Sequence, residues 1–235
     1  MENSSIIQIE KLTKRFPVGK GSFTALKDIS LSFGRGEFAG LVGPSGSGKT
    51  TMLNIMGSLD SPSEGTARVM GQSVSQLSHK ESARLRNSHI GFIFQTFNLL
   101  PVYTVFDNVE FALLLQKLPA SRRKQMVMDA LEWVGLTDKA HSRPNMLSGG
   151  ESQRVAIARA IVKKPEILLA DEPTANLDAE NSHHILRTMK KLNEELHTTF
   201  IFATHDEKVM QYLRRKISLR DGKVEKDEVV ETINS

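Results

Sequence analysis

The sequence predicts an α/β protein with a parallel sheet and a block of helices inserted into it. Short unbroken apolar runs, Phe38–Val42 and Ile167–Ala170, are typical of parallel strands that are buried on both faces. A glycine-rich segment follows the first run directly, and residues 104–162, between the two runs, have a helical pattern. These three observations place the chain in the α/β class.

The other elements are justified by local signals. Proline and glycine interrupt helices, so they mark the breaks within the helical block. The dipeptide Asp221-Gly222 is typical of a tight hairpin turn. Residues after Val230 are expected to fray. In order, we expect strands from Ile6 to about Leu31 with a long loop over 17–22, a hairpin over 65–74, a helix over 78–87, helices over 104–162 with breaks at Leu118-Pro119 and near Gly135 and Pro144, strands that begin at Ile167 and Thr199, and a hairpin over 216–226.

The glycine-rich segment is expected to bind phosphate. It reads Gly43-Pro44-Ser45-Gly46-Ser47-Gly48-Lys49-Thr50, which is the G-x-x-x-x-G-K-T pattern of a nucleoside-triphosphate site. Its glycines lack Cβ atoms, so consecutive backbone N–H groups can turn toward an anion. A helix that begins near Lys49 adds the positive end of its dipole. Lys49 can reach the β- and γ-phosphates, and the Thr50 hydroxyl suits Mg²⁺.

A second phosphate-binding segment is expected at 147–154, where the chain reads LSGGESQR. Ser148 and Glu151 have the spacing of a helix capping box. Gly149 and Gly150 each cost about 1 kcal/mol relative to alanine in a helix, and a plain cap does not need them. We therefore expect another surface to approach this N-terminus closely. Because the helical block separates the segment from the loop, its nucleotide is expected on a second copy of the chain.

Further motifs follow, and together they resemble those of ATP-binding-cassette (ABC) ATPases. The similarity covers about residues 6–228. It implies the ABC ATPase fold, a P-loop NTPase core with an N-terminal antiparallel β part and an inserted α-helical subdomain. It also implies one domain over 1–235, with an α/β core from 1–95 and 164–230, the helical subdomain over 96–163 and a frayed tail over 231–235. The motifs are the LSGGE signature with Gln153 and Arg154, a Q-loop strand over 91–95, a Walker B strand over 167–173, a D-loop over 176–178 and a switch region over 204–206.

The resemblance assigns roles to these residues. Asp171 is implied to hold Mg²⁺ through water, Glu172 to polarise the attacking water, and His205 to contact the γ-phosphate and orient Glu172. Successive strand residues point to opposite sides, which also gives Asp171 and Glu172 separate tasks. The expected sites are: catalytic, Glu172, His205, Gln95 and Lys49; ATP-binding, Phe16, Gly43, Ser45, Gly46, Ser47, Gly48, Lys49, Thr50 and Thr51; ATP-binding across the dimer, Ser148, Gly149, Gly150, Glu151 and Asp178; and Mg²⁺-binding, Thr50, Gln95 and Asp171.

Two of these residues keep a second interpretation. A glutamine after a strand is usually a turn residue, and only the resemblance gives Gln95 a function. Phe16 stands where the family usually has a tyrosine that stacks on adenine, and it could instead be a core phenylalanine.

Composition fits this picture. The net charge is +4, from 31 Lys and Arg against 27 Asp and Glu. The basic runs 122–124 and 214–216 are interpreted as solvated faces, so no nucleic-acid partner is expected. The absence of cysteine suits a reducing compartment. No apolar stretch approaches the roughly 18 residues of a membrane span, and no signal peptide is seen. The expected location is cytoplasmic, on the inner face of the cell membrane through a permease.

Other ATPase classes fit less well. A chromosome-maintenance ATPase would carry a long coiled coil, a translation-associated member would carry two cassettes, and a P-loop kinase would not explain LSGGE. Residues 85–101, with Arg143-Pro144 and Leu147, resemble the branch that serves lipoprotein release, macrolide-type efflux and cell division. The resemblance implies a transporter ATPase that forms an ATP-dependent homodimer and drives a membrane permease. A non-transport ATPase that regulates an envelope or cell-division process remains the alternative.

The permease is expected to dock near Gln95–Tyr103. Residues 97–103 are unusually apolar for a connecting segment, and exposed apolar patches commonly mark binding surfaces. The competing interpretation is that Leu99, Leu100 and Val102 pack beneath the helices.

Overall fold

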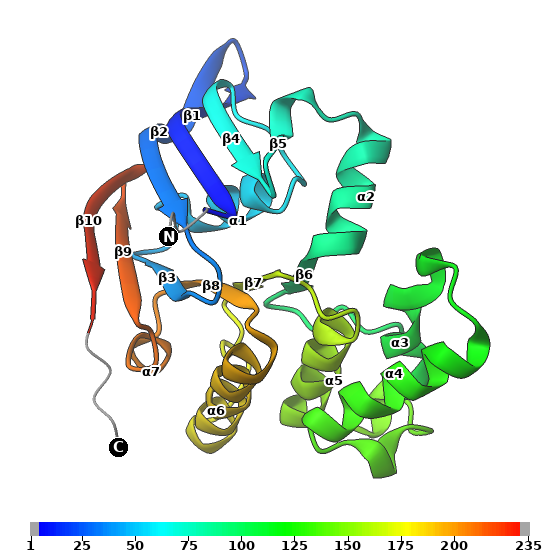
Figure 1. The fold of residues 1–235 in the computed structure, drawn as a ribbon. Coiled ribbons are helices and arrows are strands. Elements are labelled where there is room, and N and C mark those ends of the chain that lie inside the picture. The colour runs from blue at the N-terminus through cyan, green and yellow to red at the C-terminus, as the bar shows by residue number, and fades with distance from the viewer. Residues whose placement is uncertain (1–4, 231–235) are drawn as a thin grey trace.

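The computed structural model describes residues 5–230 and contains two sheets with a separate group of helices (Figure 1). The tail over 231–235, which was expected to fray, lies outside these residues. The smaller sheet is antiparallel and has the order β2-β1-β4-β5, with β1 Ile7–Val18, β2 Gly21–Phe33, β4 Glu64–Val69 and β5 Gln72–Ser73. The larger has the order β10-β9-β3-β8-β7-β6, with β3 Phe38–Val42, β6 Ile90–Ile93, β7 Ile167–Asp171, β8 Thr199–Thr204, β9 Arg215–Arg220 and β10 Lys223–Val229.

The larger sheet is parallel except at β10, which pairs antiparallel with β9. Every residue of β3 and β8 is buried, as the apolar runs predict for strands covered on both faces. Alternate residues face opposite cores: Phe38 and Val42 join the cluster beside the helices, whereas Ala39 and Leu41 join the cluster beside α1. The predicted α/β class is confirmed.

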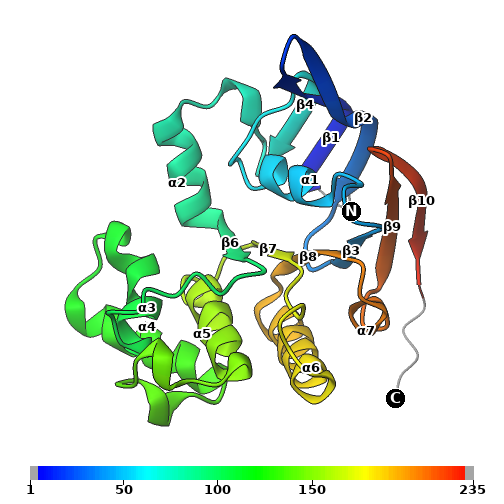
Figure 2. The same cartoon turned by 180° about the vertical axis from the view of Figure 1, so that it is seen from behind.

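The helices are α1 Lys49–Met56, α2 His79–His89, α3 Val105–Glu110, α4 Ala120–Trp133, α5 Gly149–Ile161, α6 Ala179–Leu196 and α7 Glu207–Met210, with a 3₁₀ segment, η2, over Phe111–Gln116. The breaks within 104–162 fall where they were expected, with Pro119 preceding α4 and Gly135 at φ 65° following it. Figures 1 and 2 both place α3 and α4 at the end of the molecule farthest from β10. No helix within residues 5–230 is long and apolar enough to cross a membrane.

The expected long loop over 17–22 is wrong. The two strands continue into it, with Phe16 opposite Phe23 and Val18 opposite Gly21, so only Gly19 and Lys20 form the turn. Gly19 supplies the positive φ that such a turn requires. The extended hairpin carries Phe16 and Phe23 side by side toward the phosphate-binding loop.

Candidate active site

The glycine-rich loop lies between β3 and α1, where open α/β sheets place their ligands. Gly43 has φ 149°, and a Cβ there would lie 2.1 Å from the carbonyl oxygen of Leu219. Gly48 precedes α1 with φ 105°, and a Cβ there would meet Leu26 Cδ2 at 2.6 Å. Both positions therefore require glycine for space as well as for backbone conformation.

Lys49 lies against the loop that precedes it. Its ammonium group donates hydrogen bonds to the carbonyl oxygens of Gly43 at 2.7 Å and Pro44 at 3.0 Å. Burial lowers the pKa of Lys49, and the charges of Glu172 and Asp171 oppose that shift. The lysine is thus held inside the turn, where phosphate oxygens of a nucleotide would contact it.

Thr50 and Asp171 form the candidate metal site. The Thr50 hydroxyl donates a hydrogen bond of 2.9 Å to Asp171 Oδ2, so two segments far apart in the sequence meet. Burial raises the pKa of Asp171, as does the Glu172 charge, while the Thr50 hydrogen bond opposes the rise. A hydroxyl and a carboxylate suit Mg²⁺. Residues 5–230 contain no cluster of three or more His, Cys, Asp or Glu side chains that could hold a metal ion.

Glu172 lies beside Asp171 but makes different contacts. Its φ is 46°, an uncommon value for a side chain of this size, and its N–H donates to the Ala203 carbonyl oxygen at 2.9 Å. One carboxylate oxygen is 2.6 Å from His205 Nδ1, and the other accepts from the Thr204 hydroxyl at 3.1 Å. Both oxygens of Glu172 are therefore held by consecutive residues at the end of β8.

These groups surround one pocket of about 410 Å³. The pocket includes most of the expected ATP, Mg²⁺ and catalytic residues, but neither Gly43 nor Ser47 lines it. The Ser47 hydroxyl is buried and has no hydrogen-bond partner among residues 5–230. The lining residues are Phe16, Phe23, Ala25, Ser45, Gly46, Gly48, Lys49, Thr50, Thr51, Gln95, Asp171, Glu172 and His205.

The pocket also settles the second interpretation of Phe16. Phe16 is 36% exposed, so the core interpretation is wrong, and the Lys14 ammonium lies 4.9 Å from its ring centre. Phe23 also lines the pocket and was missed from the sequence. Had the two strands been predicted to pair through 17–22, Phe23 would have been expected opposite Phe16.

Gln95 lies just beyond β6, exposed and at the pocket wall. Its carbonyl oxygen accepts a hydrogen bond of 2.8 Å from the side chain of Asn176, which joins this segment to the start of the predicted D-loop.

The predicted signature segment forms the N-terminus of α5 and lines no part of this pocket. Ser148 and Glu151 form the expected capping box, and the Ser148 N–H is the largest cause of a lowered Glu151 pKa. Ser148 and Gly149 are exposed, but Gly150 is buried. A Cβ on Gly150 would lie 2.5 Å from Asn181 Oδ1. A neighbour within the chain thus already lies beside Gly150, while the expected close approach of another surface to Gly149 and Gly150 stays a prediction.

Asn181 connects this helix to Asp178. Its backbone N–H and its side-chain amide donate to the two Asp178 carboxylate oxygens at 2.8 and 2.7 Å. The same side chain contacts the backbone at Gly150. The residues expected to act across the dimer are therefore linked to each other, and they are separate from the phosphate-binding loop.

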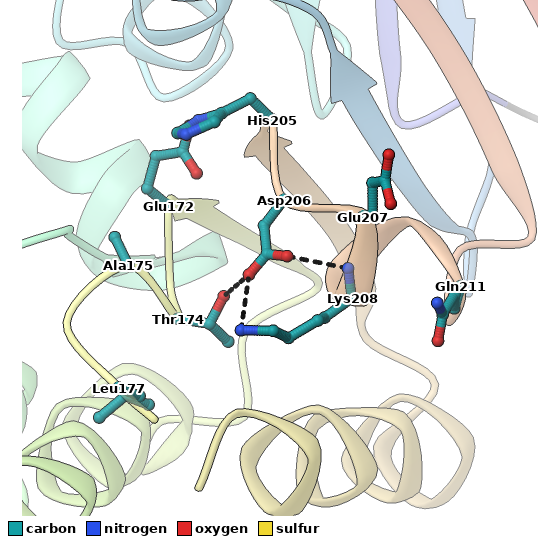
Figure 3. A pocket seen from close by; sticks show the side chains of 9 residues that line it. All are labelled: Glu172, Thr174, Ala175, Leu177, His205, Asp206, Glu207, Lys208 and Gln211. Carbon is teal, nitrogen blue, oxygen red and sulfur yellow. Dashed lines mark hydrogen bonds and ion pairs between the residues drawn. The ribbon is translucent and has the colours of Figure 1, made fainter. Parts of the chain in front are cut away.

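A second pocket of about 520 Å³ shares Glu172 and His205 with the first (Figure 3). Asp206 lies at its centre: it accepts from the Thr174 hydroxyl at 3.4 Å and from the Lys208 N–H at 2.9 Å. Through these bonds the predicted switch region contacts the chain just before the predicted D-loop.

A protein-family model described as "ABC transporter" matches residues 26–175, which is more than half of the chain. The chain belongs to this family. It is 44% identical over 221 residues to the ABC transporter ATP-binding protein YtrE of Bacillus subtilis, covering 92% of this chain and 96% of YtrE. It is 41% identical to the lipoprotein-releasing system ATP-binding protein LolD of Bacteroides thetaiotaomicron, covering 94% of this chain and all of LolD.

Other relatives are longer. The macrolide export ATP-binding/permease protein MacB of Burkholderia thailandensis is 43% identical over 219 residues, and the chain spans only 33% of its length. Among solved structures, the dimeric ATP-binding cassette MJ0796 in a post-hydrolysis state, bound to ADP and Pi, has a TM-score of 0.88 and 40% identity. That match covers 96% of this chain and 99% of MJ0796. Membership of this family confirms the predicted fold, the ATPase class and the cofactors ATP and Mg²⁺.

Proposed function

We propose that the chain is the ATP-binding and ATP-hydrolysing subunit of a transporter of the lipoprotein-release and macrolide-efflux type. In this proposal it dimerises on ATP binding, forms two composite sites, and drives a membrane permease from the cytoplasmic face. The observation that carries the proposal is that the two predicted phosphate-binding segments of one chain do not share a pocket. The pocket at Lys49 contains the groups for hydrolysis, while the exposed Ser148 helix end has no part in it.

The hydrolytic roles follow from the contacts. Lys49 and the loop N–H groups bind the phosphates. Thr50 and Asp171 would hold Mg²⁺, which would supply positive charge beside the phosphate oxygens. Glu172 orients and polarises the attacking water, and His205 orients Glu172 and contacts the γ-phosphate. Gln95 lies at the pocket wall, where its side chain would help to hold Mg²⁺ or the attacking water.

The composite site needs a second copy because the Ser148 helix end lines no part of the pocket of its own chain. Backbone N–H groups at a helix N-terminus favour an anion, and Gly149 leaves room for one beside Ser148. Asp178 is joined to the same helix through Asn181, so both would approach the partner's nucleotide together. The relative MJ0796, which is described as a dimer, supports this arrangement.

The permease would dock in a groove of about 470 Å³ between α2, β6, η2 and α5. Its rim is apolar and exposed at Leu59, Phe111 and Leu115. Arg86, Arg159 and Lys163 supply positive charge, and no acidic residue lines the groove. An amphipathic segment of a membrane protein fits this combination of apolar and cationic surface.

The groove is joined to the catalytic pocket by the segment that was expected to dock. Arg159 donates to the carbonyl oxygens of Asn98 at 2.6 Å and Phe97 at 2.7 Å, a few residues beyond Gln95. Leu99 packs against the core, as the competing interpretation held, but Val102 is 71% exposed, which that interpretation does not explain.

Size-exclusion chromatography of Glu172→Gln tests the proposal. The variant should bind ATP but lose hydrolysis by 10²- to 10⁴-fold, because a positioned base contributes about that much. It should then elute as a dimer with ATP and as a monomer with ADP. Adding Ser148→Arg should abolish the dimer, since the arginine would occupy the space of the phosphate. Equal elution with either nucleotide would contradict the composite site.

A regulator of an envelope or cell-division process is the second candidate, because the same branch of the family includes such proteins. Co-expression with the protein encoded beside this chain separates the two. A membrane protein that forms a stable complex and moves a cargo with ATP supports transport, whereas a complex that moves none supports the regulator.

A further inference from the structure

Thr204 ends β8 immediately before His205, as the first residue of the predicted switch region. The residue is completely buried. Its hydroxyl donates to Glu172 Oε2 at 3.1 Å and accepts from the Asp206 N–H at 3.0 Å. A buried hydroxyl next to the proposed water-polarising carboxylate is in a position to affect the reaction.

The direction of the Thr204 proton is set by its neighbours. A threonine hydroxyl has one proton to donate. The Asp206 N–H must donate to the hydroxyl oxygen, and an ionised Glu172 can only accept, so the proton points at Glu172. Asp206 is itself held by the Thr174 hydroxyl and the Lys208 N–H (Figure 3). The donor to Glu172 is therefore fixed by a chain of hydrogen bonds behind it.

His205 holds the other oxygen of Glu172, but its side chain is far more exposed than that of Thr204. The His205 side chain is 60% exposed and lines both neighbouring pockets. An exposed ring is held less firmly than a buried side chain, so His205 alone restrains Glu172 weakly. Thr204 is buried at the end of a strand that pairs on both sides, so its hydroxyl is held in place.

We propose that Thr204 is a positioning residue for ATP hydrolysis, and that its hydroxyl holds the Glu172 carboxylate toward the attacking water while His205 engages the phosphate. The inference rests on the role proposed above for Glu172. Thr204 is buried and does not line the pocket, so it acts through Glu172.

The test compares the steady-state ATPase activities of Thr204→Val and Thr204→Ser. Valine keeps the shape of threonine without the hydroxyl, so kcat should fall about 10- to 100-fold, as for the loss of one hydrogen bond to a charged group. KM and the equilibrium affinity for ATP should stay unchanged, and serine should restore most of kcat. In a Glu172→Gln background, Thr204→Val should leave the residual turnover unchanged.

Thr199→Val is the matched control. Thr199 begins the same strand and is equally buried, and its hydroxyl likewise donates once, to the Gly34 carbonyl oxygen at 3.0 Å, and accepts once, from the Gly36 N–H at 2.9 Å. It lies at the end of β8 away from the pocket. The control variant should lose similar thermal stability and keep its kcat. Thr204→Ala replaces Thr204→Val should the valine variant not fold.

A normal kcat in Thr204→Val, or an equal fall in Thr199→Val, overturns the proposal. The turnover of Glu172→Gln then shows whether the Thr204 proposal alone has failed or the proposed role of Glu172 as well. Normal turnover in Glu172→Gln removes the role of Glu172 itself, whereas an inactive Glu172→Gln beside a normal Thr204→Val removes only the role of Thr204.

Discussion

The Thr50 hydroxyl donates a hydrogen bond of 2.9 Å to Asp171 Oδ2, across 121 positions of sequence. The two side chains proposed to hold Mg²⁺ are thus already in contact. Burial raises the pKa of the Asp171 carboxylate. A cation would enter between groups whose distance is fixed by β7 and α1.

The first prediction concerns this pair. Thr50→Val removes the hydroxyl, so the Mg²⁺ concentration that gives half-maximal ATPase activity should rise by about 10- to 100-fold, the effect of losing a group that orients a metal ligand. Thr50→Ser keeps the hydroxyl and should resemble the wild type. Titration of ATPase activity with Mg²⁺ measures both. An unchanged midpoint in Thr50→Val would remove Thr50 from the metal site.

The second prediction separates the two adjacent glycines of α5. Gly150→Ala places a methyl group against Asn181, so it should lower the free energy of unfolding by about 1–3 kcal/mol, as overpacking does. Gly149→Ala meets its nearest neighbour, the Asn176 carbonyl oxygen, only at 3.7 Å and should not destabilise the monomer. Urea unfolding of both variants checks this. Equal losses would show that the Gly150–Asn181 contact does not govern stability.

The third prediction tests the docking groove with two neighbouring leucines. Leu115 is 79% exposed and lines the groove, whereas Leu114 is 50% exposed and does not. Leu115→Glu should leave folding and basal ATPase activity intact but prevent co-purification with the co-expressed membrane subunit. Leu114→Glu should keep that complex. Leu100, in the segment that was expected to dock, is unsuitable for such a change because it is half-buried and its backbone is held by Asn108.

The fourth prediction concerns pH. Burial, with a contribution from Arg86, lowers the pKa of Lys163 from 10.5 to about 8. Below about pH 8 the lysine is protonated in both the folded and unfolded states, and the full cost of burying its charge is present. As pH rises toward 10.5 the folded state loses its proton first, so that cost disappears. From about pH 7.5 to about pH 10, the wild type should gain roughly 2 kcal/mol of stability relative to Lys163→Met. Unfolding at several pH values measures this difference. A free energy of unfolding that changes with pH by the same amount in both proteins would contradict the prediction.

The sequence predicted the elements whose signals are local. β3, β7 and β8 were predicted because strands buried on both faces are continuously apolar, and the capping box at Ser148 because its residues stand three apart. The extension of the first hairpin was missed because residues 17–22 include proline, two glycines and serine, which are typical of loops. Only pairing with the neighbouring strand makes them extended.

Parts of the candidate site depend on contacts that no local pattern records. Asn181 lies where a Cβ on Gly150 would be, and Thr204 faces Glu172 because β7 and β8 are neighbours. A sequence shows which residue types are present, but not which one of many threonines meets a given carboxylate. The family resemblance provided the motif residues and could not provide these additional contacts.

The hairpin of β1 and β2 has a consequence for nucleotide choice. The residues it contributes to the pocket are Phe16, Phe23 and Ala25, whose side chains offer apolar surface and no hydrogen-bonding group. Stacking on an aromatic ring tolerates any base, since every base has a π-face. Discrimination against GTP or CTP would need a polar group aimed at the edge of the base. We therefore expect guanine and cytosine nucleotides to compete with ATP for the pocket. The relative concentrations of the nucleotides in the cell, rather than recognition of the base, would then determine which one is consumed.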